Sequence, residues 1–140
     1  SYGTVGGYKP ADAVEYHYLT TLAGVMEKED ADNWEFVVSP KLKELYNKKD
    51  YGPYGDGDNM YVCFLTNNDI TGGNSGSPVI DAKGNLIGIA FDGNWEAMSG
   101  DIAFEHELQR CINMDMRYFL FVLDKYAGAR HLLEEIKIIR

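Results

Sequence analysis

Residues Thr71–Pro78 read Thr-Gly-Gly-Asn-Ser-Gly-Ser-Pro, and they lead into Val79–Asp81, the turn Ala82–Asn85 and the apolar run Leu86–Phe91. Two β-prone runs around a four-residue turn that contains glycine predict a β-hairpin. Glycines on both sides of Ser75 allow a tight turn that exposes its hydroxyl group and directs backbone N–H groups toward one point. The stretch therefore indicates a serine nucleophile for acyl transfer, located on a loop that leads into a hairpin.

Attack by Ser75 on a carbonyl carbon would need hydrogen-bond donors for the oxyanion that forms. The N–H groups of Gly73 and Ser75 are expected to supply them, with Asn74 between the two. A bare Gly-x-Ser-Gly motif is more often a turn without a catalytic role. The proline at Pro78 and the hairpin that follows it favour the catalytic interpretation.

The composition and charge of the chain exclude some classes of partner. Its 140 residues are 45% hydrophobic and 13% aromatic, enough for one packed domain. A formal net charge of -9 would repel the phosphate backbone of a nucleic acid. The longest apolar run, Tyr118–Leu123, is much shorter than the roughly 20 residues that cross a bilayer. We expect no nucleic-acid partner and no membrane span.

The residue pattern predicts mostly strands, followed by helix at the carboxyl end. Ser39 is expected to cap a helix over Pro40–Lys49. Apolar residues recur at helical spacing over Met116–Tyr126, Gly128 ends that helix, and His131–Ile138 adds a second helical piece. Besides the hairpin, expected strands cover Tyr2–Tyr8, Thr20–Met26, Trp34–Val38, Met60–Leu65, Asp101–Phe104 and Arg110–Met114.

Several stretches resemble known peptidases. The nucleophile segment and its hairpin resemble those of chymotrypsin-like serine peptidases, where they belong to the second of two β-barrels. The resemblance to the bacterial dipeptidyl-peptidase 7 and 11 family is more specific and covers almost the whole chain, with the dipeptidyl-peptidase 7 type most similar. It rests on Leu86–Ile102 (LIGIAFDGNWEAMSGDI), Asp115–Tyr118 (DMRY), Asp124–Gly128 (DKYAG), Tyr2–Val5 (YGTV), Gly24–Asp30 (GVMEKED) and Asn33–Phe36 (NWEF).

This resemblance implies a fold, an activity and a location. Residues 1–114 would form an all-β, six-stranded chymotrypsin-like barrel, the second of a double-barrel enzyme, and residues 115–140 a helical segment packed on it. Members of the family release dipeptides from peptides with a free amino terminus, by acyl-enzyme catalysis. They are exported by Gram-negative bacteria, which implies a periplasmic or cell-surface location.

The resemblance also assigns substrate-binding roles to Asp92, Gly93 and Asn94. Asp92 would hold the free α-amino group of the substrate, although an aspartate before a glycine is also an ordinary turn residue. Gly93 occupies the position that selects the side chain before the scissile bond. Members that cut after Asp or Glu have Arg there, and members that cut after apolar residues have Gly. Asn94 would line the same region, and cleavage after apolar residues is expected.

A serine nucleophile needs a base, and the chain offers only His17, His106 and His131. Their neighbours in sequence suggest surface or packing roles. The family keeps its catalytic His and Asp in the first barrel, so the resemblance implies that an N-terminal barrel of the same protein is missing here and that this chain alone is inactive. The exposed inter-barrel face would favour self-association, and a homodimer is one expected form.

Some alternatives remain open on the residues alone. Cys63 and Cys111 could pair, but two buried free thiols are the preferred interpretation. No metal or organic cofactor is expected, and the calcium-loop-like step Asp56–Asp58 is interpreted as a polar turn. A glutamyl-type endopeptidase would share Gly-Asn-Ser-Gly-Ser-Pro, and a non-catalytic peptide-binding barrel could retain it.

Overall fold

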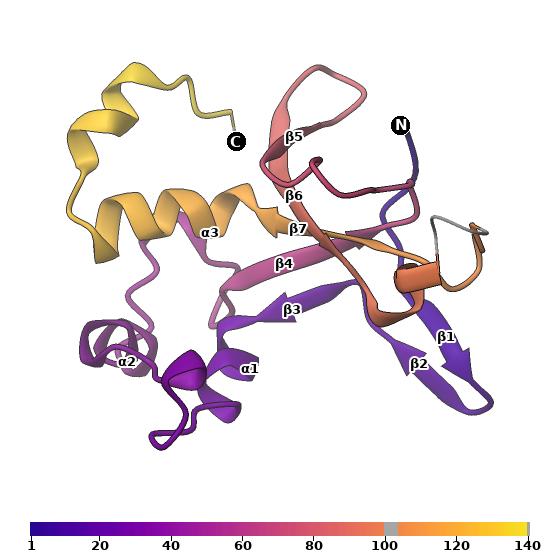
Figure 1. Ribbon diagram of the computed structural model, residues 1–140. Helices are drawn as coiled ribbons and strands as arrows, with labels where there is room; N and C mark the ends of the chain where they lie inside the picture. The colour runs from indigo at the N-terminus through magenta and orange to yellow at the C-terminus, as the bar shows by residue number, and fades with distance from the viewer. Residues whose placement is uncertain (100–103, 140) are drawn as a thin grey trace. The chain divides into compact units, whose positions relative to one another are not determined.

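The computed structural model describes residues 1–99 and 104–139, which form two compact units (Figure 1). One comprises Ser1–Thr20 and Cys63–Met116, and we call it the sheet unit. The other comprises Thr21–Val62 and Arg117–Arg140, and we call it the helical unit. The expected division into 1–114 and 115–140 stays a prediction. The compact units have different bounds, because residues from the first half of the chain cluster with the terminal helices.

The sheet unit is built around a five-stranded sheet, in which three of the pairings, β4–β7, β7–β6 and β6–β5, have an antiparallel register. The strands lie side by side in the order β3 (Leu19–Thr21), β4 (Tyr61–Thr66), β7 (Cys111–Asp115), β6 (Leu86–Gly93) and β5 (Ser77–Ile80). A second, two-stranded sheet pairs β1 (Tyr8–Ala11) with β2 (Val14–Tyr16). Strands that are distant in sequence therefore meet beside the hairpin that follows Ser75.

The β-rich fold class with helix at the carboxyl end is confirmed, and so is the β5–β6 hairpin. Pro78 pairs with Ile89 in that hairpin, and Gly84 adopts a positive φ of 84° in its turn. Among the described residues, the strands form two sheets and no closed six-stranded barrel. One reason is that Tyr2–Tyr8, interrupted by glycines, contributes only an isolated bridge from Val5 to Thr66 before β1 begins.

Two expected strands near the amino terminus differ in the structure, and a third, later in the chain, lies mostly outside the described residues. Of the expected strand Thr20–Met26, only Thr20 and Thr21 belong to a strand, β3. The chain then turns into helix α1 (Leu22–Glu27), which is rich in good helix formers. Trp34–Val38 is not a strand, because Asn33 caps a 3-10 helix at Trp34–Phe36 by accepting a bond from Glu35 N at 3.2 Å. The expected strand at Asp101–Phe104 lies, for residues 101–103, outside the described residues.

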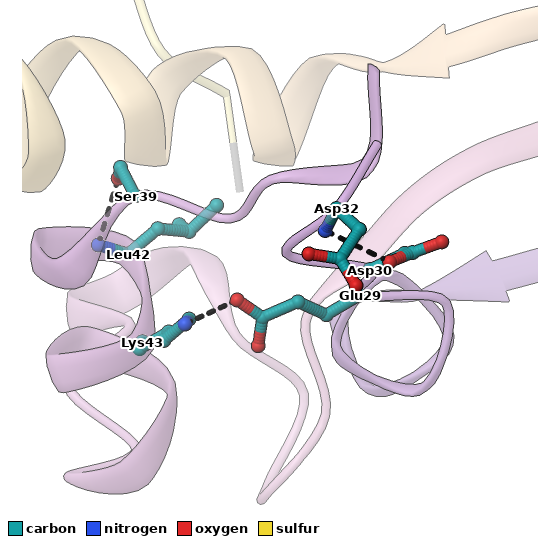
Figure 2. Close-up of polar contacts among 6 residues, drawn as sticks. All are labelled: Glu29, Asp30, Asp32, Ser39, Leu42 and Lys43. Atoms are coloured by element: carbon teal, nitrogen blue, oxygen red, sulfur yellow. Dashed lines mark hydrogen bonds and ion pairs between the residues drawn. The ribbon is translucent and has the colours of Figure 1, made fainter. Parts of the chain in front are cut away.

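The helical unit confirms the capped helix that the sequence predicts. Helix α2 (Pro40–Asn47) begins after Ser39, whose Oγ accepts a hydrogen bond from Leu42 N at 3.2 Å (Figure 2). An ion pair between Lys43 and Glu29 ties α2 to the segment that follows α1 (Figure 2). Beside it, Asp30 accepts a bond from the backbone N–H of Asp32 at 3.0 Å (Figure 2). These local contacts fix the loop between the two helices.

The expected terminal helix is present, with a change of pitch. Helix α3 (Met116–Phe121) continues as a π-helical turn at Val122–Tyr126, and Gly128 follows with a positive φ of 67°. A 3-10 helix at Arg130–Glu135 completes the element order. In the part of the chain that the structure describes, no helix has both the length and the apolar composition to cross a membrane.

Both cysteines are free thiols, as the preferred interpretation expects, but only Cys111 is buried and Cys63 is half-buried. Cys63 on β4 pairs with Met114, and Cys111 on β7 pairs with Thr66, so the two thiols are offset along neighbouring strands. Burial raises the pKa of both cysteines above the ordinary thiol value. They are therefore protonated side chains of the sheet at neutral pH.

Candidate active site

Ser75 lies on an exposed turn between β4 and β5. Gly73 and Gly76 flank it with positive φ angles of 93° and 91°, a backbone region that glycine enters without strain. The turn is closed by Asn74 N donating to Thr71 O at 3.1 Å and by Ser77 N donating to Asn74 O at 3.0 Å. The glycines that the sequence analysis singled out thus have the conformational role expected of them.

The backbone N–H groups around Ser75 differ in whether they have acceptors. Gly76 N donates to Ala90 O at 2.8 Å. The N–H groups of Gly73 and Ser75 donate to no acceptor among residues 1–99 and 104–139. The Asn74 side chain holds the turn by accepting a bond from Thr71 N at 3.0 Å. The two amides expected to bind an oxyanion are therefore the ones left without a partner in this part of the chain.

The Ser75 hydroxyl bonds to an irregular point of β6. Ala90 pairs with Asn113 and Asp92 pairs with Ile112, so Phe91 is an extra residue that forms a β-bulge. Ser75 Oγ donates to the carbonyl oxygen of Phe91 at 2.9 Å. The bulge therefore brings the main chain just before Asp92 and Gly93 to the serine. Sequence reasoning missed this contact, because a bulge depends on pairing with β7.

Asp92 is exposed at the end of β6. One carboxylate oxygen accepts a hydrogen bond from the backbone N–H of Gly93 at 2.8 Å, which fixes the side chain against its own main chain. The other carboxylate oxygen accepts no hydrogen bond from the residues that the structure describes. A negatively charged oxygen is thus available near the Ser75 turn.

Gly93 pairs with Cys111 at the end of β6. A Cβ atom added to Gly93 would lie 2.9 Å from the Cβ of Ala97, so any larger residue requires the following turn to move.

Asn94 is only 8% exposed. Its Nδ2 donates to Glu96 Oε2 at 2.9 Å and to Leu108 O at 2.8 Å. Its side-chain amide group is therefore used inside the protein, next to Gly93.

The contacts of the histidines match their expected packing roles. His17 accepts a bond from the backbone N–H of Leu19 at 3.1 Å, and its ring stacks on Tyr18. His106 packs edge-on against Phe104. Among the described residues of the sheet unit, neither histidine hydrogen-bonds Ser75, and His131 lies in the helical unit. Within the described ranges, no group of three His, Cys, Asp or Glu residues could hold a metal ion.

A second set of contacts around Asn94 had no signal in the sequence. Arg110 is only 8% exposed, and Tyr8 donates its hydroxyl hydrogen to Glu96 Oε2 at 2.9 Å. We call Tyr8, Asn94, Glu96 and Arg110 the Asn94 network. Its members come from both ends of the sheet unit, so no local motif could have revealed it.

Known proteins with the same sequence pattern are peptidases. Residues 1–138 match the family described as Peptidase S46. The chain is 62% identical, over 99% of its own length, to Dipeptidyl-peptidase 7 of Phocaeicola vulgatus, and 54% identical, also over 99%, to the Asp/Glu-specific dipeptidyl-peptidase of Porphyromonas gingivalis. It spans only 19% of the length of each of these relatives.

Solved structures agree with the sequence matches. The crystal structure of Porphyromonas endodontalis DPP11 in complex with the dipeptide Arg-Glu superposes with a TM-score of 0.92 at 51% sequence identity. The match covers 95% of this chain and 19% of that one. A further crystal structure of the same protein gives a TM-score of 0.93 and covers 96% of this chain. With these matches over nearly its full length, the chain belongs to the peptidase S46 family.

Proposed function

We propose that this chain contains the nucleophile of a serine dipeptidyl-peptidase that releases amino-terminal dipeptides after apolar residues. The relatives named above are dipeptidyl-peptidases, and the chain matches them over almost all of its length. The observation that supports the assignment most is the exposed Ser75, with the unpartnered N–H groups of Gly73 and Ser75 beside it in the described structure. This arrangement suits acyl transfer.

In the proposed mechanism, Ser75 Oγ attacks the carbonyl carbon of the second substrate residue. The hydroxyl proton passes to a base, and the Gly73 and Ser75 amides stabilise the negative oxygen. Collapse of the intermediate breaks the peptide bond, protonates the departing amine and leaves the dipeptide as an ester on Ser75. Water then hydrolyses the ester. Before attack, the hydroxyl must turn away from the Phe91 carbonyl, which is its acceptor in this structure.

The base is proposed to come from the remainder of a longer protein. The chain spans about a fifth of the length of its relatives, 19% in the case of Dipeptidyl-peptidase 7 of Phocaeicola vulgatus. An N-terminal barrel with the catalytic His and Asp would complete the site, and the chain by itself would be inactive. Export to the periplasm or cell surface of a Gram-negative bacterium and assembly into a homodimer are parts of the same proposal.

Asp92 would make the enzyme an exopeptidase. The carboxylate oxygen that lacks a partner in the described structure can accept hydrogen bonds from a protonated α-amino group. Such charge-assisted bonds are roughly twice as strong as neutral ones. A substrate bound in this way has its second peptide bond, not its first or third, at Ser75, so the products are dipeptides.

Gly93 would set the preference for an apolar residue before the scissile bond. It has no side chain, and therefore no charge with which to pair an acidic substrate residue. The relatives include both Dipeptidyl-peptidase 7 and Asp/Glu-specific enzymes, so this finer assignment rests on Gly93. Asn94 would contribute through its position behind Gly93, because its amide group is bonded inside the protein.

The experiment compares peptides with free and acetylated amino termini, using the longer protein that contains this chain. We expect rapid release of dipeptides from the free peptide and none from the acetylated peptide. A glutamyl-type endopeptidase would cleave both. The variant Ser75→Ala should lose activity by about 10⁴-fold or more, as expected for a nucleophile, whereas binding by a non-catalytic barrel would be indifferent to the change.

A further inference from the structure

We propose that Glu96 and Tyr8 are positioning residues that hold the turn behind Gly93 and thereby tune which side chain fits before the scissile bond. This inference rests on the proposed function, in which Gly93 contacts that substrate residue. Tyr8 and Glu96 lie 88 positions apart in sequence, and their hydrogen bond joins the first strand of the sheet unit to the turn that follows β6.

The Glu96 carboxylate is the link between two donors. Its Oε2 accepts one hydrogen bond from the Tyr8 hydroxyl and one from Asn94 Nδ2, each at 2.9 Å. The pKa of Tyr8 is raised, first by burial and further by Glu96, so the phenol is protonated and able to donate at neutral pH. Glu96 therefore fixes the Asn94 side chain from the side of β1.

Asn94 passes this restraint to the main chain next to Gly93. Its Oδ1 accepts a hydrogen bond from Arg110 N at 2.8 Å, and its own backbone N–H donates to Arg110 O at 2.9 Å. Side chain and backbone of Asn94 are thus both anchored to the residue that precedes β7. Because Asn94 is buried, a lost partner leaves a polar group without compensation from water.

Arg110 completes the network through hydrogen bonds from its guanidinium group to main-chain carbonyl oxygens. The group donates to the main-chain oxygen of Gly7 from Nε at 3.2 Å and from Nη2 at 2.9 Å. It also donates to the carbonyl oxygens of His106, Glu107 and Gln109 at 2.8, 3.2 and 2.7 Å. The guanidinium carbon lies 5.6 Å from the centre of the Tyr8 ring. Arg110 thereby joins the backbone before β1 to the loop before β7.

The turn that this network holds lies directly against Gly93. Ala97 N donates to Asn94 O at 2.9 Å, and a Cβ atom on Gly93 would be 2.9 Å from the Ala97 side chain. Movement of the turn therefore changes the space beside Gly93. Displacements of about 1 Å in substrate-positioning groups can lower activity by as much as 10²-fold. The Glu96 and Tyr8 hydrogen bonds do not include Ser75, yet they would determine the shape of the proposed subsite.

The test uses four variants of the longer protein that contains this chain. Glu96→Ala removes the acceptor of the Tyr8 and Asn94 hydrogen bonds, Glu96→Gln keeps an acceptor of the same shape, and Tyr8→Phe removes one donor. Tyr54→Phe is the matched control, because its hydroxyl donates to Asp124 Oδ2 at 3.0 Å within the helical unit. Steady-state kinetics are measured with two free-amino peptides, one with Leu and one with Glu before the scissile bond. Circular dichroism checks folding of each variant.

We expect Glu96→Ala to raise KM for the Leu peptide by about tenfold with a small change in kcat, and to reduce the preference for Leu over Glu. Tyr8→Phe should change KM and the preference for Leu in the same directions, but by less. Glu96→Gln should retain most of the selectivity that Glu96→Ala loses. Tyr54→Phe should leave selectivity unchanged.

Two results would overturn the positioning role. One is unchanged KM and selectivity in Tyr8→Phe and in folded Glu96→Ala, and the other is an equal shift in the Tyr54→Phe control. If Glu96→Ala does not fold, KM and selectivity of Tyr8→Phe alone decide whether the positioning role holds. Failure of the unmodified protein to release dipeptides from either peptide is a different result, and it would overturn the proposed function itself.

Discussion

The Ser75 turn and the Asn94 network lie in the same sheet unit but are stabilised in different ways. The turn is exposed and is closed largely by bonds between neighbouring residues, such as Asn74 N to Thr71 O. In the network, Asn94 and Arg110 are buried, Tyr8 and Glu96 are half-buried, and Arg110 bonds to Gly7, 103 positions away. The proposed chemistry therefore rests on a short local motif, whereas the support of the proposed substrate-binding residues depends on long-range contacts. Damage to the turn should affect rate, and damage to the network should affect stability and selectivity.

The largest expected effect comes from changing the turn. Gly73→Ala places a side chain at a φ of 93°, where no neighbour lies within 4 Å of the new Cβ. The cost is therefore conformational, and relief of the strain rotates the Gly73 amide away from the oxyanion position. Loss of such a donor should lower kcat by about 10²–10³-fold with little change in melting temperature.

Gly72→Ala is the control for that prediction. Gly72 lies in the same turn, has open space around its Cβ position and does not adopt a positive φ. The activity of the Gly72→Ala variant should stay close to that of the unmodified protein. Equal losses in Gly72→Ala and Gly73→Ala would show that the turn tolerates no side chain, and would remove the argument for a specific oxyanion donor.

An intermediate effect is expected from Asp92→Asn, which removes the charge proposed to bind the substrate ammonium group. Hydrogen bonds between charged groups contribute about 1.5–3 kcal/mol, so kcat/KM for free-amino peptides should fall by about 10–100-fold. Asp69→Asn removes the same charge from another exposed position of the sheet unit and should have little effect. Similar losses in both variants would indicate a general electrostatic effect on substrate binding.

The smallest effect on kcat, with a clear effect on stability, is expected from Asn94→Ala. The change leaves the backbone N–H of Arg110 and the carbonyl of Leu108 without their Asn94 partners in a buried region. Such a loss should lower the unfolding free energy by about 1–3 kcal/mol, measured by urea denaturation. Asn59→Ala, at an exposed position, is the control. A variant as stable as this control would remove the proposed anchoring role of Asn94.

Local patterns predicted those elements whose contacts are local. The β5–β6 hairpin follows from β-prone runs on both sides of the turn that contains Gly84, and the Ser39 cap of α2 follows from Ser-Pro before an amphipathic stretch. The β1–β2 hairpin was missed, because its turn has Ala13 at a positive φ of 61° where glycine or asparagine would have been the signal. The strand expected at Thr20–Met26 ends at Thr21 for a different reason, because its β-branched start is followed by helix-forming residues.

The same distinction applies to the site. The bonds that close the turn around Gly73 and Asn74 join neighbouring residues, so the residue pattern was enough to predict a tight glycine turn. The oxyanion role of the Gly73 and Ser75 amides stays a prediction. The bulge at Phe91 is set by its register with β7, and the burial of Asn94 is set by Arg110, which lies 16 positions further along the chain. No local spacing encodes either contact. Residue roles that depend on strand pairing therefore needed the structure.

The central claim, that Ser75 is an activated nucleophile in the longer protein, is tested most directly by labelling with a fluorophosphonate. This reagent reacts with serine hydroxyls that an enzyme activates, and mass spectrometry identifies the modified residue. We expect rapid labelling of Ser75 in the folded protein, none in Ser75→Ala, and none in a folded sample of this chain alone. Release of dipeptides by a protein in which Ser75 stays unlabelled, or in which another serine is labelled, would contradict the account.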